Sequence, residues 1–270
     1  MDQKGGNQVR SLALNDKIIL ITGAGGHLGS AICCQLAGAG AHVLINGRSA
    51  EKLHVLAETI KNGGGRATPL VGDVTNDTDQ EYMVEQLLRT FGRLDGLVNN
   101  AYTGAVGTIE SATRDQMRQS LEMSIVSPFS LIQRLLPLMK RSEAPSVVNV
   151  ASMYGMVSPD GRIYGNSGLN NPPFYGAGKA GLIQLTRYLA CHLATQNIRI
   201  NAISPGPFPP QSIKADDPVF HAKLAAKVPM ERIGLADEVG GAVQFLLSDA
   251  ASYVTGVNIP IDGGWTAGSN

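Results

Sequence analysis

A short apolar run near the start of the chain passes directly into a glycine-rich turn. Residues 17–21 have the composition of a buried strand, and the turn at 23–29 has the sequence Gly-Ala-Gly-Gly-His-Leu-Gly. A helical pattern follows at 30–39. Glycines let a backbone approach a pyrophosphate closely, and a helix N-terminus favours negative charge. This order of strand, turn and helix is therefore the setting that a dinucleotide-phosphate site requires.

Strand and helix patterns alternate along the rest of the chain. Further strands are expected at 41–46, 67–71, 94–98, 146–150, 199–203 and 257–261. Helices are expected at 49–62, 77–91, 114–140, 175–195 and 237–248. Such alternation predicts an α/β fold, a Rossmann-type doubly wound parallel sheet of seven strands with helices on both faces. We expect a single domain at 15–270, preceded by a flexible or loosely packed arm at 1–14.

Composition narrows the range of partners. The formal net charge of the 270 residues is zero and the pI is near 7, which argues against nucleic acid or an anionic membrane surface. No apolar run approaches the length that spans a bilayer, and residues 1–15 lack the apolar core of a signal peptide. Cys33, Cys34 and Cys191 have no metal-like spacing with histidine. We therefore expect a cytoplasmic protein without a metal site.

Several predicted strands end in residues that can serve a ligand site. Asp73 and Val74 follow the third strand, and Asn100 and Ala101 follow the fourth. Ser152 follows the fifth strand, and the pair 205–206, Pro-Gly, follows the sixth. Ligands of open α/β sheets bind at the carboxyl edge of the strands. These residues are therefore expected to line one crevice.

Tyr175 and Lys179 form a second kind of signal. They are four residues apart, so on a helix both side chains leave the same face one turn apart. A nearby ammonium favours the phenolate form, and this predicts a lowered pKa for Tyr175, suited to proton transfer near neutral pH. The alternative for this pair alone is a surface lysine beside a packed tyrosine.

Taken together, these motifs resemble the short-chain dehydrogenase/reductase family, in its single-domain branch with Tyr-x-x-x-Lys. The resemblance extends from about residue 17 to 264. It implies that Tyr175 is the general acid or base, that Ser152 polarises the substrate oxygen, and that Lys179 holds the nicotinamide ribose and tunes Tyr175. It also implies cofactor contacts from the following residues: Gly23, Gly26, His27, Leu28, Gly29, Asp73, Val74, Asn100, Ala101, Pro205 and Gly206.

Three positions depart from the family pattern. His27 stands where the family usually has glycine, and it is either close to phosphate or a helix-start residue without a special role. Tyr102 replaces the last glycine of Asn-Asn-Ala-Gly, either near the pocket mouth or in packing. Ser124 aligns with the family's catalytic asparagine. A serine can still bind a water molecule, so Ser124 is a fourth catalytic candidate.

The end of the second strand bears on the choice of cofactor. An acidic residue there disfavours a 2′-phosphate, and the stretch 46–49, Asn-Gly-Arg-Ser, contains none. Arg48 can pair with a 2′-phosphate and Ser49 can donate to it, which predicts a preference for NADP(H), with NAD(H) possible. The alternative is that Arg48 stacks on adenine or faces solvent.

The segment between Ser152 and Tyr175 is longer than is usual in the family. We expect loops 155–174 and 207–230 to form the substrate walls, and the amides and arginine of the first favour a polar substrate, including a sugar-derived or carboxylated one. The alternative is a solvated loop or a subunit contact. Apolar residues in the second loop, Phe208, Ile213 and Phe220, leave a hydrophobic ketone open.

The expected activity is NAD(P)-dependent interconversion of a ketone and a secondary alcohol on a small molecule. One alternative is reduction of a hydrophobic ketone or a 3-oxoacyl thioester. Another is a cofactor-binding sensor or scaffold with little turnover, which the departures at 27 and 124 allow. A dehydratase or epimerase is disfavoured, because the chain lacks a separate substrate domain. By resemblance, we expect a homo-oligomer, a tetramer or a dimer.

Overall fold

The computed structural model describes residues 10–165, 170–210 and 216–268. These residues form a seven-stranded sheet, and every neighbouring pair of strands is parallel. The strand order is β3-β2-β1-β4-β5-β6-β7. The strands are β1 (Ile18–Ile21), β2 (His42–Gly47), β3 (Arg66–Val71), β4 (Gly96–Asn99), β5 (Ser146–Val150), β6 (Arg199–Pro205) and β7 (Asn258–Ile261). The predicted doubly wound α/β fold is confirmed.

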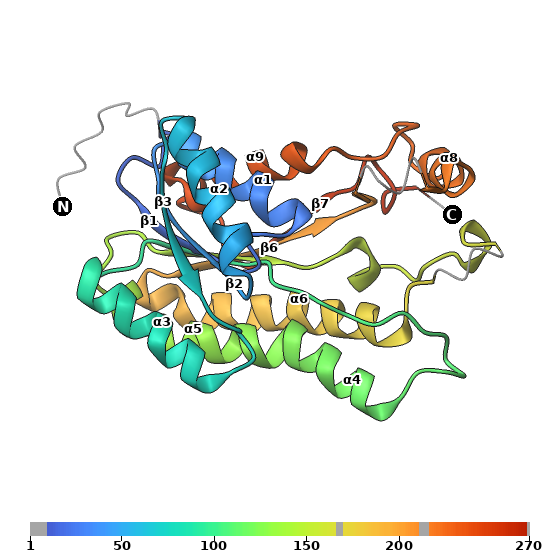
Figure 1. Cartoon of the computed structure of the whole chain (residues 1–270), viewed down its shortest axis with the longest axis horizontal. Helices are drawn as coiled ribbons and strands as arrows, with labels where there is room; N and C mark the ends of the chain where they lie inside the picture. Colours follow the sequence, from blue (N-terminus) through green and yellow to red (C-terminus); the bar gives the residue numbers. More distant parts are fainter. Residues whose placement is uncertain (1–9, 166–169, 211–215, 269–270) are drawn as a thin grey trace.

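Helices cover both faces of the sheet (Figure 1). On one face lie α1 (His27–Gly38), α2 (Ala50–Asn62) and α9 (Gly240–Leu247). On the other lie α3 (Asp77–Thr90), α5 (Ser127–Met139) and α6 (Pro173–Leu193). Two helices extend past the sheet beside the long loops, α4 (Arg114–Leu121) and α8 (Pro218–Ala226). No helix of the described ranges is long and apolar enough to cross a bilayer.

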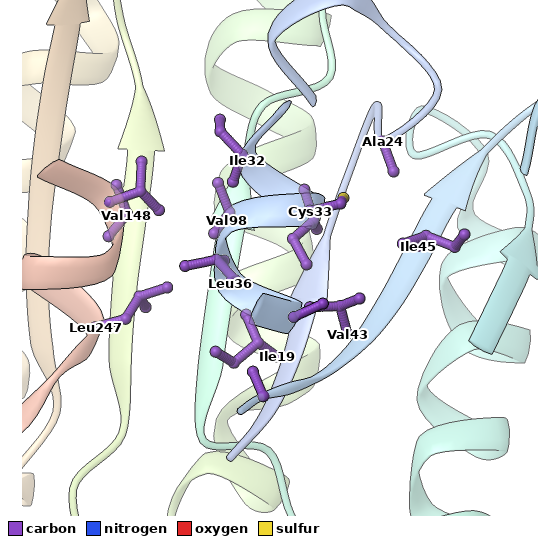
Figure 2. Close-up of a cluster of buried hydrophobic side chains, with 14 of the residues drawn as sticks. Ile19, Ala24, Ile32, Cys33, Leu36, Val43, Ile45, Val98, Val148 and Leu247 are labelled. Carbon is purple, nitrogen blue, oxygen red and sulfur yellow. The ribbon is translucent and has the colours of Figure 1, made fainter. Parts of the chain in front are cut away.

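Each face of the sheet has its own hydrophobic core. Figure 2 shows the core beneath α1, where Ile32 and Leu36 pack among strand residues such as Ile19, Val43 and Val98. These side chains are fully buried. The opposite core joins Leu97 of β4 to Leu131 and Leu135 of α5. Strands buried on both faces read as continuous apolar runs, which is why the sequence located them well.

Side chains at the helix starts set several boundaries. Ser49 caps α2 by accepting from the backbone N–H of Lys52, and Asn76 caps α3 in the same way. Thr113 and Gln116 form a reciprocal capping box at the start of α4. Such caps satisfy the first N–H groups of a helix, which otherwise lack partners.

The predicted helix at 114–140 is interrupted. A π-helical turn, Glu122–Val126, separates α4 from α5. Single π turns insert an extra residue into an α-helix and occur often at functional sites. The helical pattern of the sequence persists through this turn, so the pattern alone did not reveal it.

The predicted arm at 1–14 needs a partial correction. Residues 1–9 lie outside the described residues, whereas residues 10–14 contact the domain and Leu14 among them is buried. Leu14 is fully buried, and its N–H donates to the carbonyl of Ala39. The carbonyls of Ser11 and Leu12 accept hydrogen bonds from Ala250 and Gln244. The apolar Leu14 side chain joins the core under α1, so the ordered domain begins before residue 15.

Candidate active site

An open cleft of about 660 Å³ runs along the carboxyl edge of the strands. Its walls include most of the residues that the sequence predicted: Gly23, Gly26, His27, Leu28, Gly29, Arg48, Ser49, Asn100, Ser152, Tyr175, Lys179, Pro205 and Gly206. Four predicted residues do not line it: Asp73, Val74, Ala101 and Ser124. Val74 is instead part of the core near α3. Among the lining residues that the prediction omitted are Lys52 and Thr103.

The glycine-rich turn closes one end of this cleft. Gly23 has a φ of +63°, and a Cβ there would lie 2.7 Å from the Cα of Ala101. A Cβ on Gly29 would lie 2.2 Å from the carbonyl oxygen of Gly23. Both positions therefore exclude any side chain. The turn can in this way bring backbone N–H groups and the start of α1 to the cleft, which fits a pyrophosphate.

Asn100 braces the turn from the neighbouring strand. Its side-chain amide donates to the carbonyls of Thr22 and Gly23 at 3.0 and 3.1 Å. The Thr22 hydroxyl in turn accepts from the N–H groups of Asn100 and Ala101. Asn100 thus supports the shape of the turn, and Ala101 is the residue that Gly23 of the turn approaches most closely.

Basic residues gather where α2 begins. Arg48, Ser49 and Lys52 all line the cleft, and Lys52 lies in the first turn of α2. The Arg48 guanidinium is exposed and lies 3.8 Å from the carboxylate of Asp73. Asp73 also accepts hydrogen bonds from the N–H and hydroxyl of Thr75, so its carboxylate is held within its own turn. Two cations and a helix start suit a phosphate group. The sequence could have indicated Lys52 as a cleft residue, because it lies three residues after Ser49, in the first turn of the same helix.

Ser152 lies just after β5 and is 5% exposed. Its hydroxyl accepts a hydrogen bond from the N–H of Tyr154 at 3.2 Å and lies close enough to Tyr175 to lower the pKa of that phenol. The residue therefore connects the end of β5 to the first turns of α6, and its hydroxyl lies at the cleft.

Tyr175 and Lys179 leave α6 one turn apart and both line the cleft. The Lys179 ammonium donates to the carbonyl of Val150 at 2.7 Å and lies 5.8 Å from the Tyr175 ring centroid. Burial lowers the pKa of Lys179 to about 8. The pKa of Tyr175 is raised by burial, and its hydrogen bond with Ser152 opposes that rise.

The pKa of Tyr175 is shifted in the direction opposite to the sequence prediction. We expected the ammonium of Lys179 to lower the pKa of Tyr175. In the structure, burial of the phenol raises the pKa of Tyr175 by more than the interaction with Ser152 lowers it. The pKa therefore lies above the ordinary value for tyrosine. The sequence argument considered the charge without the burial, which depends on tertiary packing.

Ser124 lies in the π-helical turn and packs against α6 rather than the cleft. It is 1% exposed, and its hydroxyl has no hydrogen-bond partner among the described residues. A Cβ added to Gly178 would lie 2.7 Å from this hydroxyl oxygen. Ser124 thus packs against Gly178, the residue before Lys179 on α6. It forms no hydrogen bond to Lys179 among the described residues.

Tyr102 lies in the cleft between the loop after β4 and α6. Its ring meets the Tyr175 ring edge-on with centroids 4.9 Å apart, and its centroid is 5.0 Å from the Lys179 ammonium. Its hydroxyl is 3.1 Å from that of Ser120, which donates to the carbonyl of Phe174. Of the two alternatives left open for Tyr102, the cleft position is the one observed.

The long segment before α6 contacts two other loops, although residues 166–169 lie outside the described residues. The Asn170 side chain accepts from the N–H of Gly107 at 3.1 Å and donates to its carbonyl at 2.7 Å. The carboxylate of Asp160 lies 2.6 Å from the ammonium of Lys227, just after α8. The Tyr164 ring stacks on Phe220 of α8. The described part of the segment is therefore fastened to the loop after β4 and to the region of α8, and none of its residues lines the cleft.

The chemistry of the cleft fits a dinucleotide better than a metal ion. Among the described residues, no group of three His, Cys, Asp or Glu side chains could hold a metal. The cleft instead has a glycine turn at a helix start, two basic residues at one end and a hydroxyl–phenol–ammonium group at the other. Together, these residues can bind a nucleotide and move a proton to or from a bound oxygen.

The chain is similar to known proteins over nearly its whole length. Residues 23–266 match a family model described as enoyl-(acyl carrier protein) reductase. A 3-oxoacyl-(acyl-carrier-protein) reductase from Thermotoga maritima is 34% identical over 254 residues, covering 94% of this chain and 99% of its own. The Pseudomonas aeruginosa RhlG/NADP active-site complex has a TM-score of 0.86 at 32% identity, covering 96% of this chain and 99% of its own. A putative NAD(P)-dependent gluconate 5-dehydrogenase from Beutenbergia cavernae, with bound NADP, has a TM-score of 0.85 at 31% identity, with coverage of 95% and 99%.

Proposed function

The chain belongs to the short-chain dehydrogenase/reductase family, and from this premise we propose that it interconverts a ketone and a secondary alcohol with NADP(H). The observation that carries the proposal is the meeting of Ser152, Tyr175 and Lys179 in the cleft beside the glycine turn. Hydroxyl, phenol and ammonium are the groups needed to hold one substrate oxygen and to exchange a proton with it.

In this proposal the protein's own groups position the substrate and move the proton. The bound cofactor would supply the hydride in reduction and would accept it in oxidation. The Ser152 hydroxyl donates to the carbonyl oxygen and polarises it. Tyr175 gives its proton to that oxygen during reduction, or takes it from the alcohol during oxidation. Lys179 stabilises the phenolate that Tyr175 becomes, because its ammonium lies on the same side of α6.

The preference for NADP(H) is supported by the basic end of the cleft. Arg48 and Lys52 both line it, and the stretch 46–49 carries no carboxylate that would oppose a 2′-phosphate. The Arg48–Asp73 contact is long at 3.8 Å and exposed, so Arg48 can turn to a phosphate at small free-energy cost. NAD(H) binding remains compatible with the same cleft.

A polar, sugar-derived substrate is supported by the segment at 160–172. Its hydroxyl and amide groups include Tyr164, bonded to Tyr154, and Asn170, bonded to Gly107. The similarity to a putative gluconate 5-dehydrogenase agrees with this class. The similarity to 3-oxoacyl reductases keeps a 3-oxoacyl thioester as the second candidate, and Phe208 in the cleft wall would suit its apolar chain.

Tyr175→Phe tests the activity against a sensor or scaffold without turnover. Substrate screens follow NADPH absorbance with sugar acids, keto-esters, steroids and acyl thioesters. We expect the variant to lose turnover by a factor of about 100 or more and to keep its NADPH dissociation constant. Equal turnover in both proteins, or none in either with any substrate, would overturn the proposed enzyme.

We also propose a cytoplasmic homo-oligomer, a tetramer or a dimer. Exposed apolar side chains on the outer faces of α4, α5 and α6, including Met117, Phe129 and Tyr188, support a subunit contact there. The three cysteines are unpaired, which agrees with a reducing compartment. Light scattering after size exclusion measures the subunit number, and a monomer at micromolar concentration would contradict the proposal.

A further inference from the structure

Tyr102 contacts the two central groups of α6 at the same time. Its ring makes a T-shaped contact with the ring of Tyr175, with an angle of 72° between the planes. The Lys179 ammonium lies over the Tyr102 ring. An aromatic face attracts a cation within about 6 Å, more strongly where water is excluded. One side chain thus fixes the position of the phenol and provides an electrostatic partner for the ammonium.

The buried ammonium of Lys179 needs such a partner. It carries three N–H donors, and among the described residues it makes one hydrogen bond, to Val150. No carboxylate of the described residues forms an ion pair with it. Ser124, which aligns with the family's asparagine, leaves its hydroxyl without a partner. Two aromatic faces favour the charged lysine alongside the Val150 carbonyl, and the Tyr102 ring at 5.0 Å is nearer than the Tyr175 ring at 5.8 Å.

The Tyr102 ring is itself held in place. Its hydroxyl bonds to Ser120, and Ser120 donates to the carbonyl of Phe174, the residue before Tyr175. A Cβ on Gly104 would lie 2.5 Å from the Tyr102 hydroxyl oxygen, so the chain folds back closely against the ring. Ring, loop and the first turn of α6 form one packed unit.

We propose that Tyr102 is a positioning residue that keeps Lys179 charged and holds the ring of Tyr175 in place, in a site that lacks the family's asparagine. The placement of Tyr102 stands independently of the reaction, whereas its effect on turnover rests on the proposed function. The other titratable groups that act on Tyr175 are Tyr164 and Tyr102 itself, and Tyr154 lies close enough to be affected by Tyr175. Burial raises the pKa of Tyr102, Tyr154 and Tyr164, so all three stay neutral near pH 7.

Two substitutions separate the ring from the hydroxyl. Tyr102→Phe keeps the aromatic face and loses the bond to Ser120, whereas Tyr102→Leu fills similar space without an aromatic face. NMR of isotope-labelled lysine side chains follows the protonation of Lys179 in the cofactor-free protein, and Lys179→Arg identifies its signal. The matched control is Tyr82→Leu, which removes an exposed tyrosine from α3.

We expect the pKa of Lys179 to fall by about half a unit to one unit in Tyr102→Leu, because the ammonium stays buried and loses the aromatic face. Tyr102→Phe and Tyr82→Leu should leave it within about 0.2 units of the unchanged protein. An unchanged value in Tyr102→Leu, or an equal fall in Tyr102→Phe, would overturn the inference. Thermal unfolding of each variant confirms that the protein compared is folded.

A second measurement links the inference to turnover. With any substrate found by the screen, Tyr102→Leu should lower kcat roughly three- to tenfold and shift the pH profile of kcat, while Tyr102→Phe stays close to the unchanged protein. A shifted lysine pKa in a chain without turnover would leave the role of Tyr102 intact and reject the proposed enzyme. Turnover with identical pH profiles in all variants would reject the role of Tyr102 and leave the enzyme intact.

Discussion

The ammonium of Lys179 donates a 2.7 Å hydrogen bond to the carbonyl oxygen of Val150, the last residue of β5. Two residues further along the chain, Ser152 lies close enough to Tyr175 to lower the pKa of its phenol. The end of β5 and the first turns of α6 therefore meet at two neighbouring places, through Lys179 and through Ser152. The hydroxyl, the phenol and the ammonium thereby line the same cleft.

The buried Lys179 is expected to reduce stability near neutral pH. Its folded pKa of about 8 lies below the ordinary value of 10.5, so the unfolded chain binds more protons between these pH values. The penalty is full below pH 8 and disappears as the pH rises past 10.5. Lys179→Met should raise the free energy of unfolding at pH 7 by roughly 1 to 3 kcal/mol, after loss of the Val150 bond, and abolish turnover. Urea unfolding between pH 7 and 10.5 measures the free energy of unfolding of each protein, and Lys61→Met, at an exposed lysine, is the control. A Lys179→Met protein that is less stable than the unchanged protein at pH 7 would contradict the prediction.

Gly178 lies where α6 and the π-helical turn touch. An alanine Cβ there would lie 2.7 Å from the Ser124 hydroxyl oxygen and 2.9 Å from its Cβ. Gly178→Ala should destabilise the protein by about 1 to 3 kcal/mol, and adding Ser124→Gly should restore most of the loss. Gly241→Ala is the matched control, since nothing lies within 4 Å of that position on α9, and it should stabilise by about 0.5 to 1 kcal/mol. Chemical denaturation compares Gly178→Ala, Ser124→Gly, the double variant and Gly241→Ala. Additive effects of Gly178→Ala and Ser124→Gly would rule out the contact.

The basic end of the cleft is expected to distinguish the cofactors. Arg48→Ala should weaken NADPH binding about tenfold and leave NADH binding nearly unchanged, because only NADPH carries a 2′-phosphate. Lys52→Ala should have the same direction with a smaller effect, and Lys61→Ala at the far end of α2 should have none. Titration calorimetry with both cofactors measures this. Equal losses for NADPH and NADH would place Arg48 away from the phosphate.

The two hydrogen bonds between Asn170 and Gly107 are expected to hold the long segment before α6. Asn170→Ala removes both, and we expect a protease to cut within residues 160–172 roughly three- to tenfold faster, since about 1 kcal/mol or more of local restraint is lost. Asn62→Ala, at the exposed end of α2, is the control. An unchanged cleavage rate would show that other contacts hold the segment. In the proposed enzyme, the same change should raise KM for substrate and leave the NADPH dissociation constant unaltered.

The fold was predictable because its signals are local. Each of the seven strands is a short run between turn or helix signals, and the parallel order follows from the alternation with helices. The proximity of Tyr175 and Lys179 follows from their spacing on one helix, and their meeting with Ser152 follows from the shared carboxyl edge of the sheet. These inferences need no knowledge of side-chain packing.

The details that sequence reasoning missed depend on contacts between distant segments. The raised pKa of Tyr175 results from its burial, and the ordering of residues 10–14 results from Leu14 joining the core. Neither the contact of Tyr102 with Lys179 nor the bonds of Asn170 to Gly107 has a signal in the spacing of residues. The π-helical turn keeps the helical pattern on both sides and is visible only in the backbone bonds.

This turn at Glu122–Val126 also bears on which insertions and deletions the chain can tolerate. A π turn holds one residue more than an α turn, and each residue of an α-helix rotates the following side chains by about 100°. With the extra residue, Ser120 of α4 reaches α6 while Leu131 and Leu135 of α5 reach the core. Deleting one residue here would leave a continuous, well-bonded helix whose two halves no longer face their partners together. The segment would keep its helical content and lose its alignment, so a length change that is harmless to the helix is harmful to the site.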